Sequence, residues 1–135
     1  MNKEIEEKIV SAFFVNRKKE RALYELSSKK KRNNLLFSLD IGETALIDSR
    51  YAFKIRQSFP TFKTVYEALK KHGAPEKCYV LGGRELDGKE AFLLEALKDV
   101  FGWGGAIISC IHGELAYLEG HPVIGAPNRY ILKKG

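Results

Sequence analysis

The chain of 135 residues lacks most of the features that mark special classes of protein. No apolar run approaches the roughly 18 residues that span a bilayer. The first residues, MNKEIEEKIV, carry charges where a signal peptide has an apolar stretch. There are only two cysteines, Cys78 and Cys110, and they form no metal-binding cluster. We therefore expect a cytoplasmic protein with no membrane partner.

Catalytic signatures are missing as well. Gly82-Gly83 precedes an expected helix but is not followed by the lysine-serine pair of a phosphate-binding loop. Ser109 and Cys110 fall in the middle of an expected strand, whereas a hydrolase nucleophile occupies a strained strand-to-helix turn. We interpret both cysteines as buried free thiols that act as small hydrophobes. These absences predict a protein that is not an enzyme and needs no cofactor.

What the chain does have is the composition of an ordinary globular protein. Hydrophobic residues make up 44% and charged residues 30%, which excludes a disordered tail. A chain of this length buries about two-thirds of its unfolded surface, enough for a core of its own. No internal repeat divides it. We expect residues 1–135 to form a single globular domain.

The clearest structural signal is the apolar run at residues 106–111. Its length and its branched side chains are typical of a strand that is buried on both faces. His112-Gly113 interrupts the run and residues 115–118 resume it, which predicts a tight hairpin. On the upstream side, glycines around Trp103 permit a sharp entry. We expect the rest of the chain to pack around this strand.

Before this strand, residues 78–81 predict a short strand and residues 89–100 a helix. Asp87 and Glu90 resemble the capping box that begins a helix. A helical crossover would place the strand at 78–81 parallel to the strand at 106–111. Residues 129–132 predict a last strand. Together these elements predict an α+β fold with a small mixed sheet of about four strands.

The N-terminal half is expected to be mainly helical. Apolar periodicity predicts helices at residues 3–15 and 17–26, and it leaves open whether Asn16 separates them. Ser27-Ser28 is a suitable cap for a helix over 29–39, although residues 35–39 also suit a strand. Residues 48–58 suit an edge strand or a loop. A helix over 61–72 is well defined, with Thr61 as its cap and Gly73 after its end.

Charge is the most informative property for function. Residues 16–32 contain two acidic side chains, Glu20 and Glu25, and eight basic ones, so this window holds the whole formal net charge of +6. Such density creates a positive potential that attracts phosphates or an acidic protein surface. The plain alternative is a solvated helix face. The candidate partner-binding residues are Arg17, Lys18, Lys19, Arg21, Lys29, Lys30, Lys31 and Arg32.

Two weaker patterns suggest metal chemistry. His112, Glu114 and His121 flank the expected hairpin, but loose spacing seldom makes a metal site, and a fourth ligand is lacking. Asp87-Gly88-Lys89 has the acid-x-lysine spacing of some magnesium-dependent nucleases, with Glu85 and Glu90 nearby. We favour a helix cap as the role of Asp87 and expect no metal.

We therefore expect a non-enzymatic binding protein whose basic N-terminal helices dock an anionic partner, either a nucleic acid or an acidic protein. Two alternatives stay open. One is an immunity or antitoxin type of protein, which neutralises a toxin by covering its surface. The other is a metal-dependent nuclease that uses Asp87 and Lys89.

Overall fold

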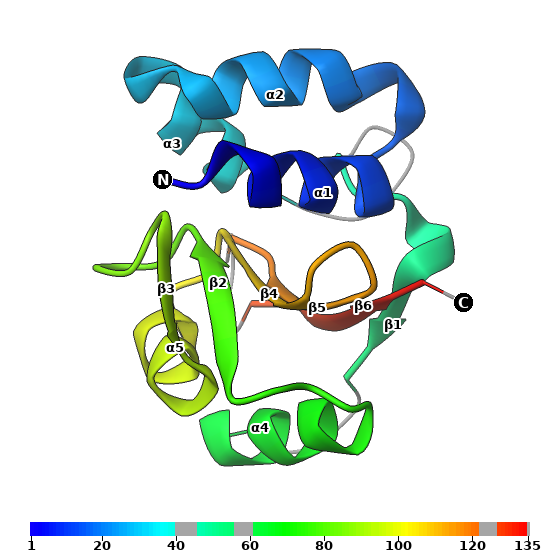
Figure 1. Cartoon of the computed structure of the whole chain (residues 1–135), viewed down its shortest axis with the longest axis vertical. Coiled ribbons are helices and arrows are strands. Elements are labelled where there is room, and N and C mark those ends of the chain that lie inside the picture. The colour runs from blue at the N-terminus through cyan, green and yellow to red at the C-terminus, as the bar shows by residue number, and fades with distance from the viewer. Residues whose placement is uncertain (40–45, 56–60, 122–126, 135) are drawn as a thin grey trace.

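A computed structural model describes residues 1–39, 46–55, 61–121 and 127–134. These residues form an α+β fold with a six-stranded sheet between two layers of helices (Figure 1). The helices are α1 (Lys3–Phe13), α2 (Lys19–Ser27), α3 (Lys29–Phe37), α4 (Phe62–Lys71) and α5 (Leu93–Val100). The strands are β1 (Ala52–Lys54), β2 (Lys77–Leu81), β3 (Lys89–Phe92), β4 (Ala106–Ile111), β5 (Leu115–Glu119) and β6 (Arg129–Lys133).

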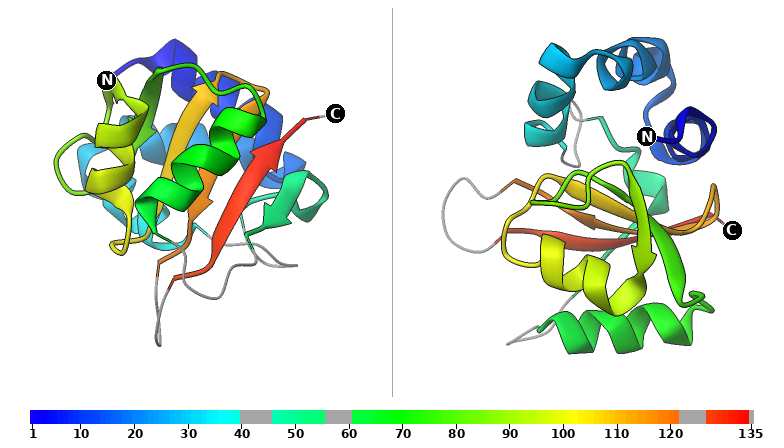
Figure 2. Two further views of the ribbon diagram at one scale, coloured as in Figure 1. Left: turned by 90° about the horizontal axis from the view of Figure 1, so that it is seen from below. Right: turned by 60° about the vertical axis from the view of Figure 1, so that its left-hand side comes forward.

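The sheet is antiparallel in every described pairing, in the order β1-β6-β5-β4-β2-β3. Helices α1, α2 and α3 cover one face, and α4 and α5 cover the other (Figure 2). Alternate residues of β4 enter the two cores, Ile107 on the first face and Ile108 on the second, and both are fully buried. The predictions that β4 is buried on both faces and that β4 and β5 form a hairpin are confirmed.

The helical elements expected from periodicity are confirmed, with shifted ends. A 3-10 turn (Asn16–Lys18) separates α1 from α2, which answers the question left open at Asn16. The Oγ of Ser28 accepts the backbone N–H of Lys31 at 3.4 Å and so begins α3, which excludes a strand at residues 35–37. Helix α4 begins at the expected cap, where Thr61 and Thr64 form a reciprocal capping box.

Residues 48–58 supply a short edge strand, as one of the two interpretations expected. A 3-10 turn (Ser49–Tyr51) leads into β1, which pairs with β6. The end of that stretch, residues 56–58, lies outside the described residues. The last strand expected at 129–132 is β6. Over the described part of the chain, no helix has both the length and the apolar character needed to cross a membrane.

The predicted mixed sheet of about four strands is wrong. β2 and β4 are antiparallel, with Leu81 opposite Ile107. The reason is an additional strand, β3, which forms a hairpin with β2. This hairpin returns the chain to the start of β2, where the N–H of Leu93 donates to the carbonyl of Glu76 at 2.6 Å. Helix α5 then carries the chain back along the sheet, so β4 enters from the opposite end.

The predicted helix over 89–100 is correspondingly too long, and the predicted cap at Asp87 is wrong. Residues 89–92 belong to β3, and α5 begins at Leu93. β3 is an edge strand of four residues in which Lys89, Glu90 and Phe92 are exposed. Such a strand has no apolar alternation, whereas the leucines that follow it have a strong helical period. The helical period of α5 therefore hides the short strand that precedes it.

Candidate binding site

The basic segment of the sequence forms a helical hairpin of α2 and α3, with α2 lying farther from the sheet than α1 (Figure 1). Lys29 and Lys30 are exposed in the first turn of α3, and Arg21 is exposed on α2. Lys31 is half-buried, with its Nζ 4.9 Å from the ring centre of the exposed Tyr24. We call this region the basic hairpin: Arg17, Lys18, Lys19, Arg21, Lys29, Lys30 and Lys31.

Some of these cations also have partners within the protein. The Nζ of Lys19 donates to the carbonyl of Ser11 at 2.7 Å. The Nε of Arg21 lies 3.6 Å from Glu25, one turn away on α2. An exposed pair of this kind is weak and salt-screened, so it leaves the guanidinium accessible to another anion. Arg21 is therefore held only weakly by its contact with Glu25.

Arg32, the eighth candidate, is placed differently from the other seven. It is 3% exposed, and all five of its N–H groups have acceptors. Nη1 and Nη2 donate to the carboxylate of Glu6 at 2.8 and 2.7 Å, and Nε and Nη2 donate to that of Asp87 at 2.9 Å each. The remaining N–H donates to the carbonyl of Leu26 at 3.0 Å. Arg32 therefore joins α1, α3 and the loop after β2, with its side chain buried between them.

The electrostatics of this buried cluster are coupled. Burial alone would lower the pKa of Arg32, but its hydrogen bonds to Glu6 and Asp87 outweigh burial and raise that pKa. Tyr79 donates its hydroxyl to Glu6 and accepts the backbone N–H of Asn2 at 3.1 Å. Burial, together with the bond to Glu6, raises the pKa of Tyr79 to about 12. Asp87 also accepts the N–H of Gly82 at 2.8 Å, so the cluster is fully hydrogen-bonded.

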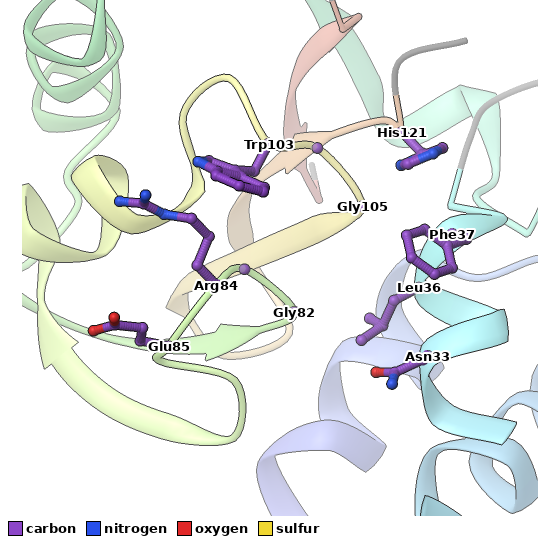
Figure 3. Close-up of a pocket in the computed structure, with 11 residues that line it drawn as sticks. Asn33, Leu36, Phe37, Gly82, Arg84, Glu85, Trp103, Gly105 and His121 are labelled. Carbon is purple, nitrogen blue, oxygen red and sulfur yellow. The ribbon is translucent and has the colours of Figure 1, made fainter. Parts of the chain in front are cut away.

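Beside the basic hairpin lies a cleft of about 530 Å³, within the usual size range of small-ligand sites (Figure 3). We call it the aromatic cleft. Helix α3 forms one side of it, and the loops that follow β2 and precede β4 form the other. Its lining residues are Asn33, Leu36, Phe37, Gly82, Gly83, Arg84, Glu85, Trp103, Gly104, Gly105 and His121.

Two exposed aromatic side chains stand on opposite sides of the cleft (Figure 3). Trp103 is 56% exposed, and the guanidinium of Arg84 lies 5.0 Å from its ring centre. Phe37 is 60% exposed and packs edge-on against His121, with ring centres 4.7 Å apart. Single exposed rings are common on protein surfaces, but these two line the same cleft, so both are available to a ligand that enters it.

Glycines allow the three segments around the cleft to approach closely. Gly82 and Gly105 both have positive φ, +97° and +65°. A Cβ at Gly82 would clash with the carbonyl oxygen of Gly105, and a Cβ at Gly105 would lie 2.9 Å from the carbonyl oxygen of Leu36. Side chains at either position would force the loops and α3 apart. The glycines therefore set the width of the cleft floor.

Two buried carboxylates hold the loops of the cleft. Asp99 of α5 is 8% exposed and accepts the backbone N–H groups of Arg84, Glu85 and Leu86, each at 3.1 Å. Glu119 of β5 is fully buried and accepts the N–H groups on either side of Trp103, from Gly102 at 2.9 Å and Gly104 at 2.8 Å. Hydrogen bonds to charged acceptors are the stronger kind. The loops that carry Arg84 and Trp103 are thus fixed before any ligand arrives.

Glu119 has further partners that keep its charge balanced. The Nε of Arg129 donates to it at 3.0 Å, and the hydroxyl of Tyr117 donates at 2.8 Å. Burial, with the Glu119 charge adding to it, raises the pKa of Tyr117. The guanidinium of Arg129 lies 3.9 Å from the ring centre of Phe101, at the start of the Trp103 loop. Glu119 and Arg129 therefore hold the Trp103 loop in place through their contacts with Gly102, Gly104 and Phe101.

The structure does not bring the weaker metal candidates together. His112 lies in the turn between β4 and β5, with its Nδ1 2.7 Å from the Oγ of Ser109, whereas His121 lies beyond the end of β5 in the cleft. Asp87, the proposed nuclease ligand, uses both carboxylate oxygens on Arg32 and Gly82. Among the described residues, no group of three or more His, Cys, Asp or Glu side chains is placed to hold a metal ion.

Both cysteines are free and buried in strands, as expected, and burial raises the pKa of each thiol to about 12. Of the cleft residues, the sequence singles out Glu85 and His121 as weak metal candidates and Gly82-Gly83 as a possible phosphate-binding loop. Comparison with protein-family models, with curated protein sequences and with solved structures found no match to this chain.

Proposed function

We propose that this protein is a non-enzymatic binding protein whose basic hairpin docks an anionic macromolecule. The support is the position of its charge. Lys29, Lys30 and Lys31 occupy the first turn of α3, where the helix dipole favours anions and disfavours cations. Three lysines at a helix N-terminus destabilise the helix, and lysines needed only for solubility could lie elsewhere on the surface without that cost. They add to the potential of the free N–H groups and strengthen an anion-attracting surface.

The placement of Arg32 sharpens this proposal. With Arg32 occupied in the interior, the remaining seven cations lie on α2, on α3 and in the 3-10 turn before α2, a stretch that contains only two acids, Glu20 and Glu25. Two of the three lysines of α3 are exposed. A partner with regularly spaced negative charges, such as a nucleic acid or an acidic protein surface, can contact several of these cations at once. Replacing the α3 lysines should therefore weaken binding without unfolding the protein.

The test measures affinity against salt concentration, with single-stranded and duplex oligonucleotides as probes. Four phosphate contacts on duplex DNA would give a slope of log affinity on log salt of roughly −3.6. The triple variant Lys29→Gln, Lys30→Gln, Lys31→Gln should flatten that slope by up to about three units. A matched control replaces the exposed Lys63, Lys71 and Lys77, at and near α4 on the other side of the sheet, with the same change in charge.

The control should bind as the wild type does, because its lysines lie away from the basic hairpin. An acidic protein partner would also show salt dependence, but it would discriminate among surfaces of similar charge. If the α3 triple variant binds nucleic acids and acidic proteins as tightly as the wild type at low salt, the lysines only solvate the helix, and the proposal is wrong.

A further inference from the structure

We propose that the aromatic cleft holds one unpaired base of a single-stranded nucleic acid whose phosphates lie along the basic hairpin. This inference rests on the proposed function and adds what that proposal leaves open, namely the class of partner. It predicts a preference for single strands over duplexes. The geometry of the cleft, its unused polar groups and its continuity with α3 support it.

Two exposed aromatic rings, Phe37 and Trp103, face the cleft from opposite sides. Unpaired bases bind proteins mainly by stacking on aromatic side chains and on arginine guanidinium planes. The cleft offers Trp103 layered with Arg84 on one side, and Phe37 with His121 on the other (Figure 3). A volume of about 530 Å³ is ample for a flat heteroaromatic ring. Stacking there would remove apolar ring surface from water.

The cleft is also lined by polar groups that can bind a ligand. Among the described residues, the side-chain amide of Asn33, the guanidinium of Arg84 and the indole N–H of Trp103 have no hydrogen-bond partner. Arg84 also lacks a carboxylate partner within the described part of the chain, so its charge is available to a phosphate. An amide presents both donors and acceptors, which suits the edge of a base.

Helix α3 connects the basic hairpin to the aromatic cleft. Lys30, Asn33 and Phe37 are separated by three and four residues, so they follow one another along a single face of the helix. The distance along the helix from Lys30 to Phe37 is about 10 Å. A base stacked on Phe37 would therefore keep its own or a neighbouring phosphate within reach of the lysines. A duplex has its bases already stacked and could use only the lysines.

The cleft is also preorganised, because hydrogen bonds within the protein already fix its two loops. Asp99 and Glu119 fix the two loops, and the backbones at Gly82 and Gly105 are in close contact, so little ordering is needed on binding. Preorganisation increases affinity because fewer groups lose freedom in the complex. An acidic peptide would use the lysines equally well, but charged residues alone do not account for two opposed aromatic walls. The two aromatic walls therefore favour an unpaired base over an acidic peptide as the occupant of the cleft.

Trp103 is the single tryptophan of the chain, so its fluorescence reports directly on the cleft. The probes are oligothymidylate and oligoadenylate of about 16 nucleotides, the upper end of known single-strand site sizes. A duplex of the same length and inorganic polyphosphate serve as comparisons. We expect single strands to quench Trp103, and we expect duplex and polyphosphate to bind in low salt without comparable quenching.

Variants separate the cleft from the lysines. Phe37→Ala and Trp103→Ala should each weaken single-strand binding roughly 5- to 150-fold, the equivalent of about 1–3 kcal/mol for a stacked base, with the salt slope unchanged. Trp103→Phe should restore most of the affinity. Phe53→Ala is the matched control, because Phe53 is equally exposed, at 56%, but lies on the edge strand β1 and does not line the cleft. It should bind as the wild type does.

The outcomes are distinguishable. If the lysine triple variant loses affinity while Phe37→Ala and Trp103→Ala keep it and Trp103 is not quenched, the cleft inference is overturned and the proposed function stands. If an acidic peptide quenches Trp103 and single strands do not, the occupant is a protein segment and the inference is wrong. If no anionic probe binds the wild type in low salt, both proposals fail.

Discussion

Removing Arg32 tests whether the structure assigns this residue correctly to the interior. We consider Arg32→Met, which keeps an unbranched apolar stem and removes the charge and all five N–H donors. Glu6, 5% exposed, would lose two hydrogen bonds and retain only that from Tyr79. Asp87 would lose two and retain the N–H of Gly82. Breaking a buried ion pair from one side typically costs about 3–5 kcal/mol, because the other charge stays buried without a partner.

Urea denaturation measures this cost. With a slope of about 2 kcal/mol/M for a protein of this size, the midpoint should fall by about 2 M. Lys30→Met is the matched control, since it removes the same charge two residues away from an exposed position. It should change the free energy of unfolding by less than about half a kcal/mol. Single-stranded binding should respond in the opposite order, more to Lys30→Met than to Arg32→Met.

A double variant separates the loss of the ion-pair attraction from the cost of leaving a carboxylate buried without a partner. Adding Glu6→Gln to Arg32→Met removes one of the two uncompensated carboxylates, so the pair of changes should cost less than the sum of the single ones, by about 1 kcal/mol or more. Equal stability of Arg32→Met and Lys30→Met would refute the buried network and return Arg32 to the set of partner-facing cations.

Three further outcomes are expected. Ile108→Ala should cost roughly 2–5 kcal/mol in urea denaturation, since Ile108 is fully buried at the centre of the sheet, and a loss below about half a kcal/mol would contradict that position. Burial and the nearby Lys8 lower the pKa of His112 in the folded protein, so the unfolded chain binds a proton at a higher pH than the folded chain does. The contribution of His112 to stability is therefore complete above about pH 6.5 and should decline as the pH falls. His112→Gln should flatten that decline when the melting temperature is measured against pH. Cys78 and Cys110, with pKa values near 12, should resist thiol reagents at pH 8 until the protein unfolds, and rapid labelling of the native protein would show that they are accessible.

Much of the fold could be predicted because its strongest signals are local. The apolar run of β4, the caps Ser28 and Thr61 and the helical period of α4 each follow from a few neighbouring residues. β3 could not be predicted in this way, because a short edge strand with exposed charges is determined by its pairing with β2 and carries no pattern of its own. Missing that one strand was enough to reverse the direction of β4 relative to β2.

The candidate site was predictable only in part. Local charge density identified the basic hairpin but not which cations would be buried. Yet Arg32 shares a helical period with Leu35, Leu36 and Leu39, so its inward position could have been inferred. The same period leaves Phe37 outside the apolar stripe. The cleft is formed by segments that are far apart in the sequence, and no local sequence pattern predicts that they come into contact.

The buried polar residues of the central strands have a consequence for the pairing register. Both faces of the β4–β5 hairpin are apolar, so a slip by one residue would exchange Ile107 with Ile108 and still bury hydrophobic surface. Hydrophobicity alone therefore does not distinguish the native register from its neighbours. Glu119 does, because a slip would carry its carboxylate to the opposite face of the sheet, away from Gly102, Gly104 and Arg129. An unpaired charge there costs several kcal/mol, so the residue that supports the Trp103 loop also excludes the misaligned sheet.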